Sequence, residues 1–325
     1  MQNGNITGSK PVSGKTESSN YQREKHLLVS RVHRKRRFTL LDIILAVLIL
    51  GAAAYFIYRI RMTLEYRWNW KMIPQYLVRY DAEKGRPVAN LLLQGFFTTI
   101  RLSIWSSLLA VILGTVMGVL RSGKSIFSRV FSRSYVELVR NLPPLVLVFI
   151  VYYFFSSQLL AALGIDDMVY QASPAVKRLI TVLFVPPGRF SAFISAVFTL
   201  GIYEGAYITE IVRAGIQSVE KGQWEAGYAL GLSPYRRMRH IILPQAGRKI
   251  LPPLAGQFIS TIKDSAIVSI ISIQELTFEG MELMSATHRT FEVWLTITAM
   301  YFLLTFACSL GVHRLEVGLK RKIGD

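Results

Sequence analysis

The sequence is poor in the residues that build metal centres and covalent catalytic sites. Its single cysteine, Cys308, lies inside an apolar run, which excludes a disulfide framework or a thiolate metal site within one chain. The five histidines are scattered over tail, loops and helix ends without metal-ligand spacing: His26, His33, His240, His288 and His313. Because no nucleophile–base set is found either, we predict that the chain is not an enzyme and holds no metal.

Acidic residues are scarce too. The 325 residues include 38 Lys and Arg but only 20 Asp and Glu, a formal charge of +18, while 51% are hydrophobic and the mean hydropathy is +0.35. A basic chain can bind nucleic acid, but that function needs a soluble basic domain. Here the charges occupy short patches between long apolar runs, which is typical of an integral membrane protein with basic cytoplasmic loops. We therefore predict contact with a lipid bilayer and not with nucleic acid.

Six apolar stretches are long enough to cross a hydrocarbon core of roughly 30 Å as helices of about 20 residues. They are Phe38–Tyr58, Leu91–Leu120, Tyr135–Leu160, Phe190–Val212, Leu254–Ile273 and Phe291–Val312. The first follows a long polar tail and leads into aromatic and basic residues, so we expect an uncleaved signal anchor. The second is too long for a straight crossing, which places Arg101 near the outer surface. The predicted fold is an all-α integral membrane protein with about six transmembrane helices.

Lysine and arginine in the loops predict the orientation of these helices. One side of the membrane receives 24 of them and the other side 11. Both termini are therefore expected in the cytoplasm. Residues 1–37 form a basic tail that is expected to be largely disordered. Residues 38–90 supply an extra N-terminal transmembrane helix and an outer loop, and residues 91–325 form the core.

The long cytoplasmic loop, residues 218–253, predicts two short helices with a turn between them. Gly231 suits a left-handed position after the first helix, and Ser233 with Pro234 suits the start of the second. We expect that second helix to stop near Pro244, since proline disfavours a helical residue before it. The acid Glu225 and the basic cluster Arg236, Arg237 and Arg239 would form a docking surface. The alternative is a surface loop whose basic residues only hold the orientation.

The same loop resembles the EAA loop of ABC importer permeases. The family pattern is E-A-A, three residues, G, nine residues, I-x-L-P, and it falls here on Glu225, Ala226, Gly227, Gly231, Ile241, Leu243 and Pro244. The one departure is Gly227 in place of the second alanine, which should loosen the helix slightly. The resemblance implies a coupling helix that seats in a cleft of a cytoplasmic ABC ATPase.

Further segments are similar to permeases for polar amino acids, of the histidine and glutamine uptake type. They run from Tyr135 to Leu145, from Gly205 to Ile216, at Gly222-Gln223 and Pro244-Gln245-Ala246, and at Lys263-Asp264-Ser265. The similarity extends from about Gly95 to the C-terminus and implies a five-helix core. It also implies a bacterial inner-membrane location, a second permease subunit, an ATPase dimer that holds ATP and magnesium, and an extracytoplasmic amino-acid-binding protein.

Two glycine patterns need separate interpretation. The stretch from Gly118 to Ser125 fits the phosphate-binding pattern G-x-x-x-x-G-K-S, but no strand precedes it and no acidic residue follows to hold magnesium. We interpret it as a coincidence and Lys124 as an inside-positive charge. The spacings Gly114-x-x-x-Gly118 and Gly201-x-x-x-Gly205 predict close helix packing in lipid.

Charged residues far inside a span usually face a partner or an aqueous cavity. Glu204 and the pair Lys263-Asp264 are candidates for the substrate path, because an amino-acid zwitterion needs one group of each sign. The alternative is a structural pair of Glu204 with Lys263. Glu210 and Arg213, three residues apart, are expected to pair with each other. Competing functions are the import of another small polar solute and secondary transport, although the internal repeat typical of many secondary transporters is not visible.

Overall fold

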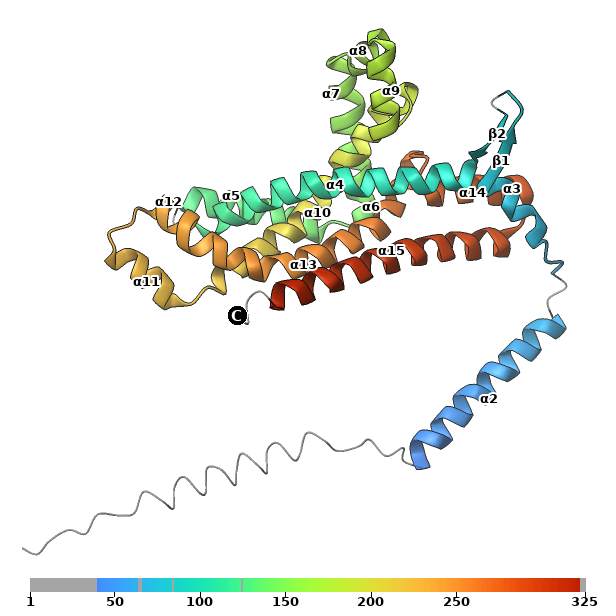
Figure 1. Ribbon diagram of the computed structural model, residues 1–325, viewed down its shortest axis with the longest axis horizontal. Coiled ribbons are helices and arrows are strands. Elements are labelled where there is room, and N and C mark those ends of the chain that lie inside the picture. The colour runs from blue at the N-terminus through green and yellow to red at the C-terminus, as the bar shows by residue number, and fades with distance from the viewer. Residues whose placement is uncertain (1–39, 64–65, 84, 124, 322–325) are drawn as a thin grey trace, which may run out of the picture. The chain divides into compact units, whose positions relative to one another are not determined.

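The computed structural model describes residues 40–63, 66–83, 85–123 and 125–321 (Figure 1). The chain divides into two compact units, Met1–Arg67 and Trp68–Asp325. In the first unit the described element is α2, Leu40–Thr63, which is apolar over Leu40–Phe56. The tail predicted over residues 1–37 and the start of the first span at Phe38 lie outside the described residues. Residues 68–90, grouped with the N-terminal helix by sequence, belong to the unit that contains the core.

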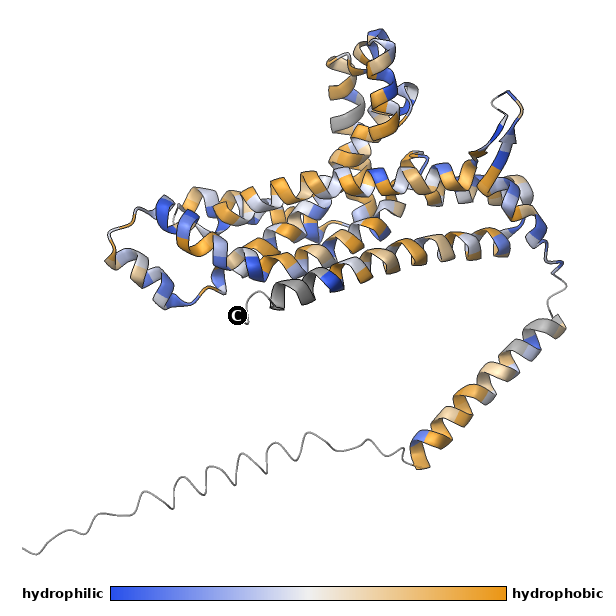
Figure 2. Cartoon of the chain, viewed as in Figure 1, coloured by the Kyte–Doolittle hydropathy of each residue, from blue (hydrophilic) through white to orange (hydrophobic). Residues whose placement is uncertain are grey.

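In the described part of that second unit, five helical stretches are long and apolar enough to cross a membrane. They are α4 (Leu91–Ser122), Pro144–Ala162, Pro187–Gln217 with α10 (Phe190–Gln217), Pro234–Ile271 and Thr290–Arg314 within α15 (Thr290–Arg321). With the shorter apolar α2, they confirm the predicted all-α fold. Figure 2 shows apolar residues along these helices and hydrophilic ones at α11, α12 and the β-hairpin.

The third predicted span begins too early. The predicted start, Tyr135, lies in α5 (Ile126–Asn141), and the membrane stretch begins only at Pro144. Leu142 and Pro143 are extended, with ψ of 143° and 132°, because a residue before proline avoids the helical region. The stretch then comprises α6 (Pro144–Ile150), a π-helical turn (Val151–Ser156) and α7 (Ser157–Ala162).

The predicted helix stop near Pro244 is also wrong. Helix α12 (Pro234–Arg237) continues through a π-helical turn, Met238–Ile242, into α13 (Leu243–Asp264). A π turn widens the helix just before the proline, which gives the ring room beside the preceding turn and needs no N–H from Pro244. The fifth helical stretch therefore starts far before the predicted Leu254, and it ends in a 3₁₀ helix, Ser265–Ile271.

Shorter elements connect the long helices. A 3₁₀ turn (Trp70–Met72) and α3 (Ile73–Leu77) lead to an antiparallel hairpin of β1 (Val78–Asp81) and β2 (Arg86–Ala89), with Val78 opposite Ala89. Helices α8 (Ile165–Gln171) and α9 (Pro174–Leu183), with α7, project from the long helices (Figure 1). The remaining helices are α11 (Lys221–Ala229) and α14 (Leu276–Thr287).

Helices α4 and α10 approach each other closely at glycines. A Cβ added to Gly114 would lie 2.6 Å from Ile208, and one added to Gly118 would lie 2.7 Å from Val212. The contact is reciprocal, because a Cβ on Gly201 would lie 2.6 Å from a methyl group of Leu109. The packing role predicted for these glycines is thus confirmed.

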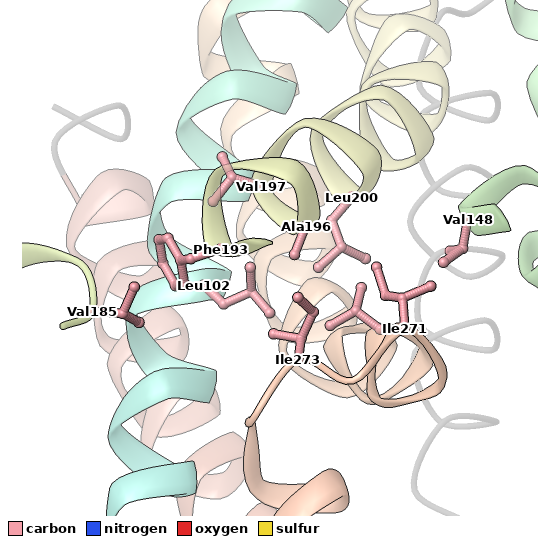
Figure 3. Packing of buried hydrophobic residues seen from close by; sticks show 10 residues of the cluster. Leu102, Val148, Val185, Phe193, Ala196, Val197, Leu200, Ile271 and Ile273 are labelled. Atoms are coloured by element: carbon pink, nitrogen blue, oxygen red, sulfur yellow. The ribbon is translucent and has the colours of Figure 1, made fainter. Parts of the chain in front are cut away.

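An apolar cluster fills the space beside this contact (Figure 3). Its buried members include Leu102 of α4, Phe193 and Leu200 of α10, and Ile271 at the end of the 3₁₀ helix. Trp105 and Arg101 of α4 donate hydrogen bonds of 3.0 Å to the carbonyl oxygens of Leu183 and Phe184 at the end of α9. The projecting helices are therefore tied to the core through α4.

We expect the substitution Gly114→Ala to destabilise the permease, because the new methyl group must displace Ile208. Overpacking of this kind costs about 1–3 kcal/mol. Gly311→Ala is a matched control in α15, since a Cβ there meets no atom within 4 Å. Thermal unfolding in detergent should show a lower midpoint for Gly114→Ala than for the control. Equal midpoints would contradict the close packing of α4 and α10.

Candidate functional site

The turn of the long cytoplasmic loop is fixed by backbone geometry. Gly231 has φ of +65°, and its N–H donates to the carbonyl of Tyr228 while the N–H of Leu232 donates to that of Gly227. These two bonds form a complete Schellman motif, which explains the need for glycine. Ser233 then caps α12 by accepting a hydrogen bond from the N–H of Arg236. The predicted helix–turn–helix is confirmed.

A buried arginine joins the two helices of the loop. Arg237 is only 3% exposed, and its guanidinium lies 3.8 Å from the centre of the Tyr228 ring and 5.9 Å from that of Trp224. A Cβ on Gly227 would lie 2.8 Å from the Cδ of Arg237. Glycine at this position therefore makes room for the arginine, which gives the departure from the EAA pattern a physical reason.

The burial of Arg237 corrects the predicted docking surface. Of the three arginines expected there, Arg236 and Arg239 are exposed and Arg237 is not. Glu225 and Ala226 lie exposed on α11. The other matched positions sit where α13 joins the loop: Ile241 and Leu243 are half-buried against an apolar cluster, and Pro244 is exposed. The exposed side of the loop thus presents an acid on one helix and bases on the other.

An ionic cluster lies near this end of the core. Glu210 accepts hydrogen bonds from Arg213 of the same helix, and it also pairs with Arg121 of α4 at 2.8 Å. The predicted Glu210–Arg213 pair is confirmed, and the additional partner Arg121 ties α10 to α4. Gly118, the first residue of the phosphate-loop pattern, lies inside α4, so the residues that lead into it are helical and not a strand, and Lys124 lies outside the described residues.

Glu204 lies halfway along α10 with no exposed surface. Its Oε2 accepts a hydrogen bond of 2.6 Å from the side-chain amide of Gln257 on α13, and its Oε1 has no donor. The neighbouring group is the Asp264 carboxylate, which interacts with it electrostatically. Two carboxylates facing each other would be stabilised by a cation between them.

Lys263 does not provide that cation. In the described part of the chain no ion pair joins Lys263 to Glu204, and the lysine side chain is exposed. The structural-pair alternative predicted Lys263 as the partner of Glu204. In the structure that partner is Gln257. Tyr203 and Tyr207, whose hydroxyl groups lie 3.2 Å apart, flank the carboxylates. The structure therefore brings Glu204 and Asp264 together and leaves Lys263 apart from them.

Sequence reasoning missed two further buried acids. Glu275 caps α14: its carboxylate accepts from the N–H groups of Thr277 and Phe278 and from the hydroxyl of Tyr301. Burial raises the pKa of Glu275, while these donors oppose the rise. An acidic residue just before a helix can cap its first N–H groups, so the position of Glu275 in the sequence could have revealed this cap.

The second missed acid, Glu279, lines a cavity of about 420 Å³ that is assembled from distant parts of the chain. It is 3% exposed, and its Oε2 has no donor. Burial, aided by Glu282, raises the pKa of Glu279 to about 7, although Arg189 opposes the rise. The lining residues come from β2, α4, α9, α10 and α14 and the segments beside them, so spacing along the sequence gives no sign of this cavity.

Comparison with known proteins agrees with this geometry. Residues 110–323 match the family "Binding-protein-dependent transport system inner membrane component". The glutamine transport system permease protein GlnP of Escherichia coli (strain K12) is 32% identical over 75% of this chain and 99% of its own length. The L-cystine transport system permease protein TcyB of Bacillus subtilis (strain 168) is 33% identical over 70% of this chain and 86% of its own.

Solved structures of ABC transporters also resemble this chain. The crystal structure of an amino acid ABC transporter with histidines is 31% identical, has a TM-score of 0.55, and covers 70% of this chain and 92% of its own. An inward-facing MetNI methionine ABC transporter shares the fold, with a TM-score of 0.53 at 18% identity over 70% of this chain and 96% of its own. The resemblance seen in the EAA loop is thereby confirmed. The chain belongs to the family of inner-membrane components of binding-protein-dependent transport systems, as the multi-pass permease subunit of an ABC importer.

Proposed function

We propose that this permease moves polar amino acids into the cell, driven by ATP hydrolysis on a separate cytoplasmic ATPase dimer. The observation that supports coupling most directly is the rigid loop 218–253. Its turn is closed by backbone bonds, and a buried arginine holds its two helices together. A loop that transmits movement between subunits must resist deformation, and these contacts stiffen loop 218–253. Glu225 stays exposed on its surface and is accessible to the ATPase.

The proposed orientation places both termini and this loop in the cytoplasm of a bacterial cell. The proposed partners follow from it: the ATPase dimer at the loop, and an amino-acid-binding protein at the opposite end. A second permease subunit is needed because the spans of one chain cannot enclose a path alone. The pair Glu204 and Asp264 supplies the substrate site, where the carboxylates bind the ammonium group of the amino acid.

Three properties of this site support an amino acid as substrate. Glu204 has no exposed surface in the described structure, so a charged ammonium group gains more from its carboxylate than it would in solvent. The free Oε1 of Glu204 still needs a donor. Lys263 directly precedes Asp264 on the same helix, and its exposed ammonium is available to the substrate carboxylate from a site shared between two subunits. Relatives named for glutamine and L-cystine transport fit this chemistry.

The coupling proposal predicts that Glu225→Lys abolishes uptake and weakens co-purification of the ATPase about tenfold to a hundredfold, the effect of losing a charge-assisted hydrogen bond. The variant should still insert into the membrane, because Glu225 is exposed. Glu220→Lys is the matched control in the same loop, outside the EAA positions. Full uptake by Glu225→Lys would remove the coupling-helix assignment.

The orientation is tested with single cysteines on a Cys308→Ser background. Cysteines at Ser9 and Lys322 should react with a charged, membrane-impermeant reagent only after the membrane is permeabilised. A cysteine at Asp166, in α8, should react in intact cells. If Ser9 reacts from outside without permeabilisation, the first span is assigned in the wrong direction.

The substrate site predicts that Glu204→Gln, which keeps the shape and removes a charge, lowers uptake at least tenfold while ATP hydrolysis remains coupled to the loop. It should also change the preference among cationic, neutral and acidic amino acids in competition assays. Glu282→Gln, on exposed surface, is the control. Wild-type uptake and preference in Glu204→Gln would show that the substrate path lies elsewhere.

A further inference from the structure

The cavity beside Glu279 lies at the end of the core away from the coupling loop. Arg189, which lines it, immediately precedes α10, and the coupling loop immediately follows Gln217 at the other end of that helix. At 1.5 Å per residue the two ends of α10 are roughly 40 Å apart, with Glu204 about halfway between them. We call this cavity the outer pocket. It is separate from the Glu204–Asp264 site.

The outer pocket holds charged groups of both signs that have unfilled hydrogen-bonding capacity among the described residues. Arg101 donates one hydrogen bond, from Nη1 to the carbonyl of Phe184, which leaves its other donors free of any protein partner among the described residues. The guanidinium of Arg189 has no hydrogen bond or ion pair in the same part of the chain. Glu279 faces them with a buried, unpartnered Oε2, and Gln274 adds a second buried oxygen without a donor, Oε1.

The two buried oxygens need an explanation, since buried polar atoms in folded proteins nearly always have a partner. The arginines are part-buried or exposed, and their remaining donors can reach a ligand in the pocket. The ligand that satisfies them must offer donors to Glu279 and Gln274 and acceptors to the two arginines. A free inorganic anion supplies only acceptors, and a metal cation is opposed by both guanidinium groups. An α-amino acid supplies both: its ammonium group is a triple donor, and its carboxylate matches the planar fork of an arginine.

The volume and the charge of the outer pocket restrict the class of ligand further. About 420 Å³ lies at the small end of ligand cavities and suits a single small molecule. Two guanidinium groups against one carboxylate leave an excess positive charge, so one arginine remains for an oxygen on the side chain of the ligand. Amino acids with an amide or carboxylate side chain fit this arrangement, whereas those with a cationic side chain do not.

The apolar cluster of Figure 3 separates the outer pocket from Glu204. Phe193 lines the pocket, and Leu200, in the same cluster, lies one helical turn before Glu204 on α10. A polar ligand in the pocket is therefore held in front of an apolar barrier. Passage beyond it requires the helices to move, which is the step that ATP-driven closure would supply.

We propose that the outer pocket is a second amino-acid site, which binds an α-amino acid with an amide or carboxylate side chain before the amino acid passes the apolar cluster to Glu204. Glu279 and Gln274 bind its ammonium group, Arg101 or Arg189 binds its α-carboxylate, and the remaining arginine binds the side-chain oxygen. This inference rests on the proposed function, because it assumes that amino acids reach this end of the permease.

Direct binding tests the outer pocket separately from transport. The permease, purified with its co-purifying subunits, is incubated without ATP in an equimolar mixture of the twenty standard amino acids, and the retained ones are quantified by mass spectrometry. We expect wild-type protein to retain glutamine, glutamate, asparagine or aspartate. Glu279→Gln and Arg189→Gln should each lower this retention about tenfold to a hundredfold, also on a Glu204→Gln background.

Matched controls are available on exposed surface nearby. Asp167→Asn lies on α8 and Arg178→Gln lies on α9; neither residue lines the pocket. Glu279→Gln removes an unpartnered buried charge, so its unfolding temperature should not fall, and Arg189 is exposed. Retention at the wild-type level in either pocket variant, or no retention by wild-type protein, overturns the outer pocket. Absence of ATP-driven uptake with retention intact would instead overturn the proposed function alone.

Discussion

The close approach of α4 and α10 is the constraint on which the rest of the core depends. Gly114 and Gly118 let the backbones come so near that a single methyl group would collide with Ile208 or Val212. Lipid supplies no hydrophobic force between helices, so this contact is stabilised by packing and by polar bonds such as Arg121 with Glu210. Because α10 is held along its length, its two ends and the carboxylate at its centre keep a fixed relation.

Helix α10 connects the three places of the chain for which a function is proposed. The outer pocket lies at its beginning, Glu204 at its middle and the coupling loop at its end. The loop is itself stiff, because Gly227 admits Arg237 between the two short helices and Gly231 closes the turn. In the proposed mechanism, a movement of the ATPase that shifts the loop is therefore transmitted to the proposed sites rather than absorbed by a flexible connection.

The sequence predicted the features that depend on local pattern, and it missed those that depend on distant partners. Hydropathy located the spans, and turn chemistry located Gly231 and Ser233. The break before Pro144 was missed because the amphipathic α5 merges into the apolar run that follows it. The helix through Pro244 was missed because burial of Ile242 and Ala246 outweighs the local preference to stop, and a π turn makes this possible.

The functional residues divide in the same way. The EAA positions follow one another in the loop, so their resemblance to the family pattern could be seen in the sequence and predicted them. The pairing of Glu204 with Gln257 and Asp264 joins two helices, and the outer pocket joins residues from Ala89 to Glu279. Only the tertiary structure brings such groups together, which is why the predicted partner Lys263 was replaced by Gln257.

The central claim is that ATP hydrolysis on another subunit drives amino-acid uptake through this chain. The direct measurement is accumulation of amino acids in proteoliposomes that contain the permease, its ATPase and its binding protein. The account predicts accumulation when ATP is supplied on the side of the coupling loop, unaffected when ion gradients are dissipated. Accumulation driven by a proton or sodium gradient without ATP would contradict it.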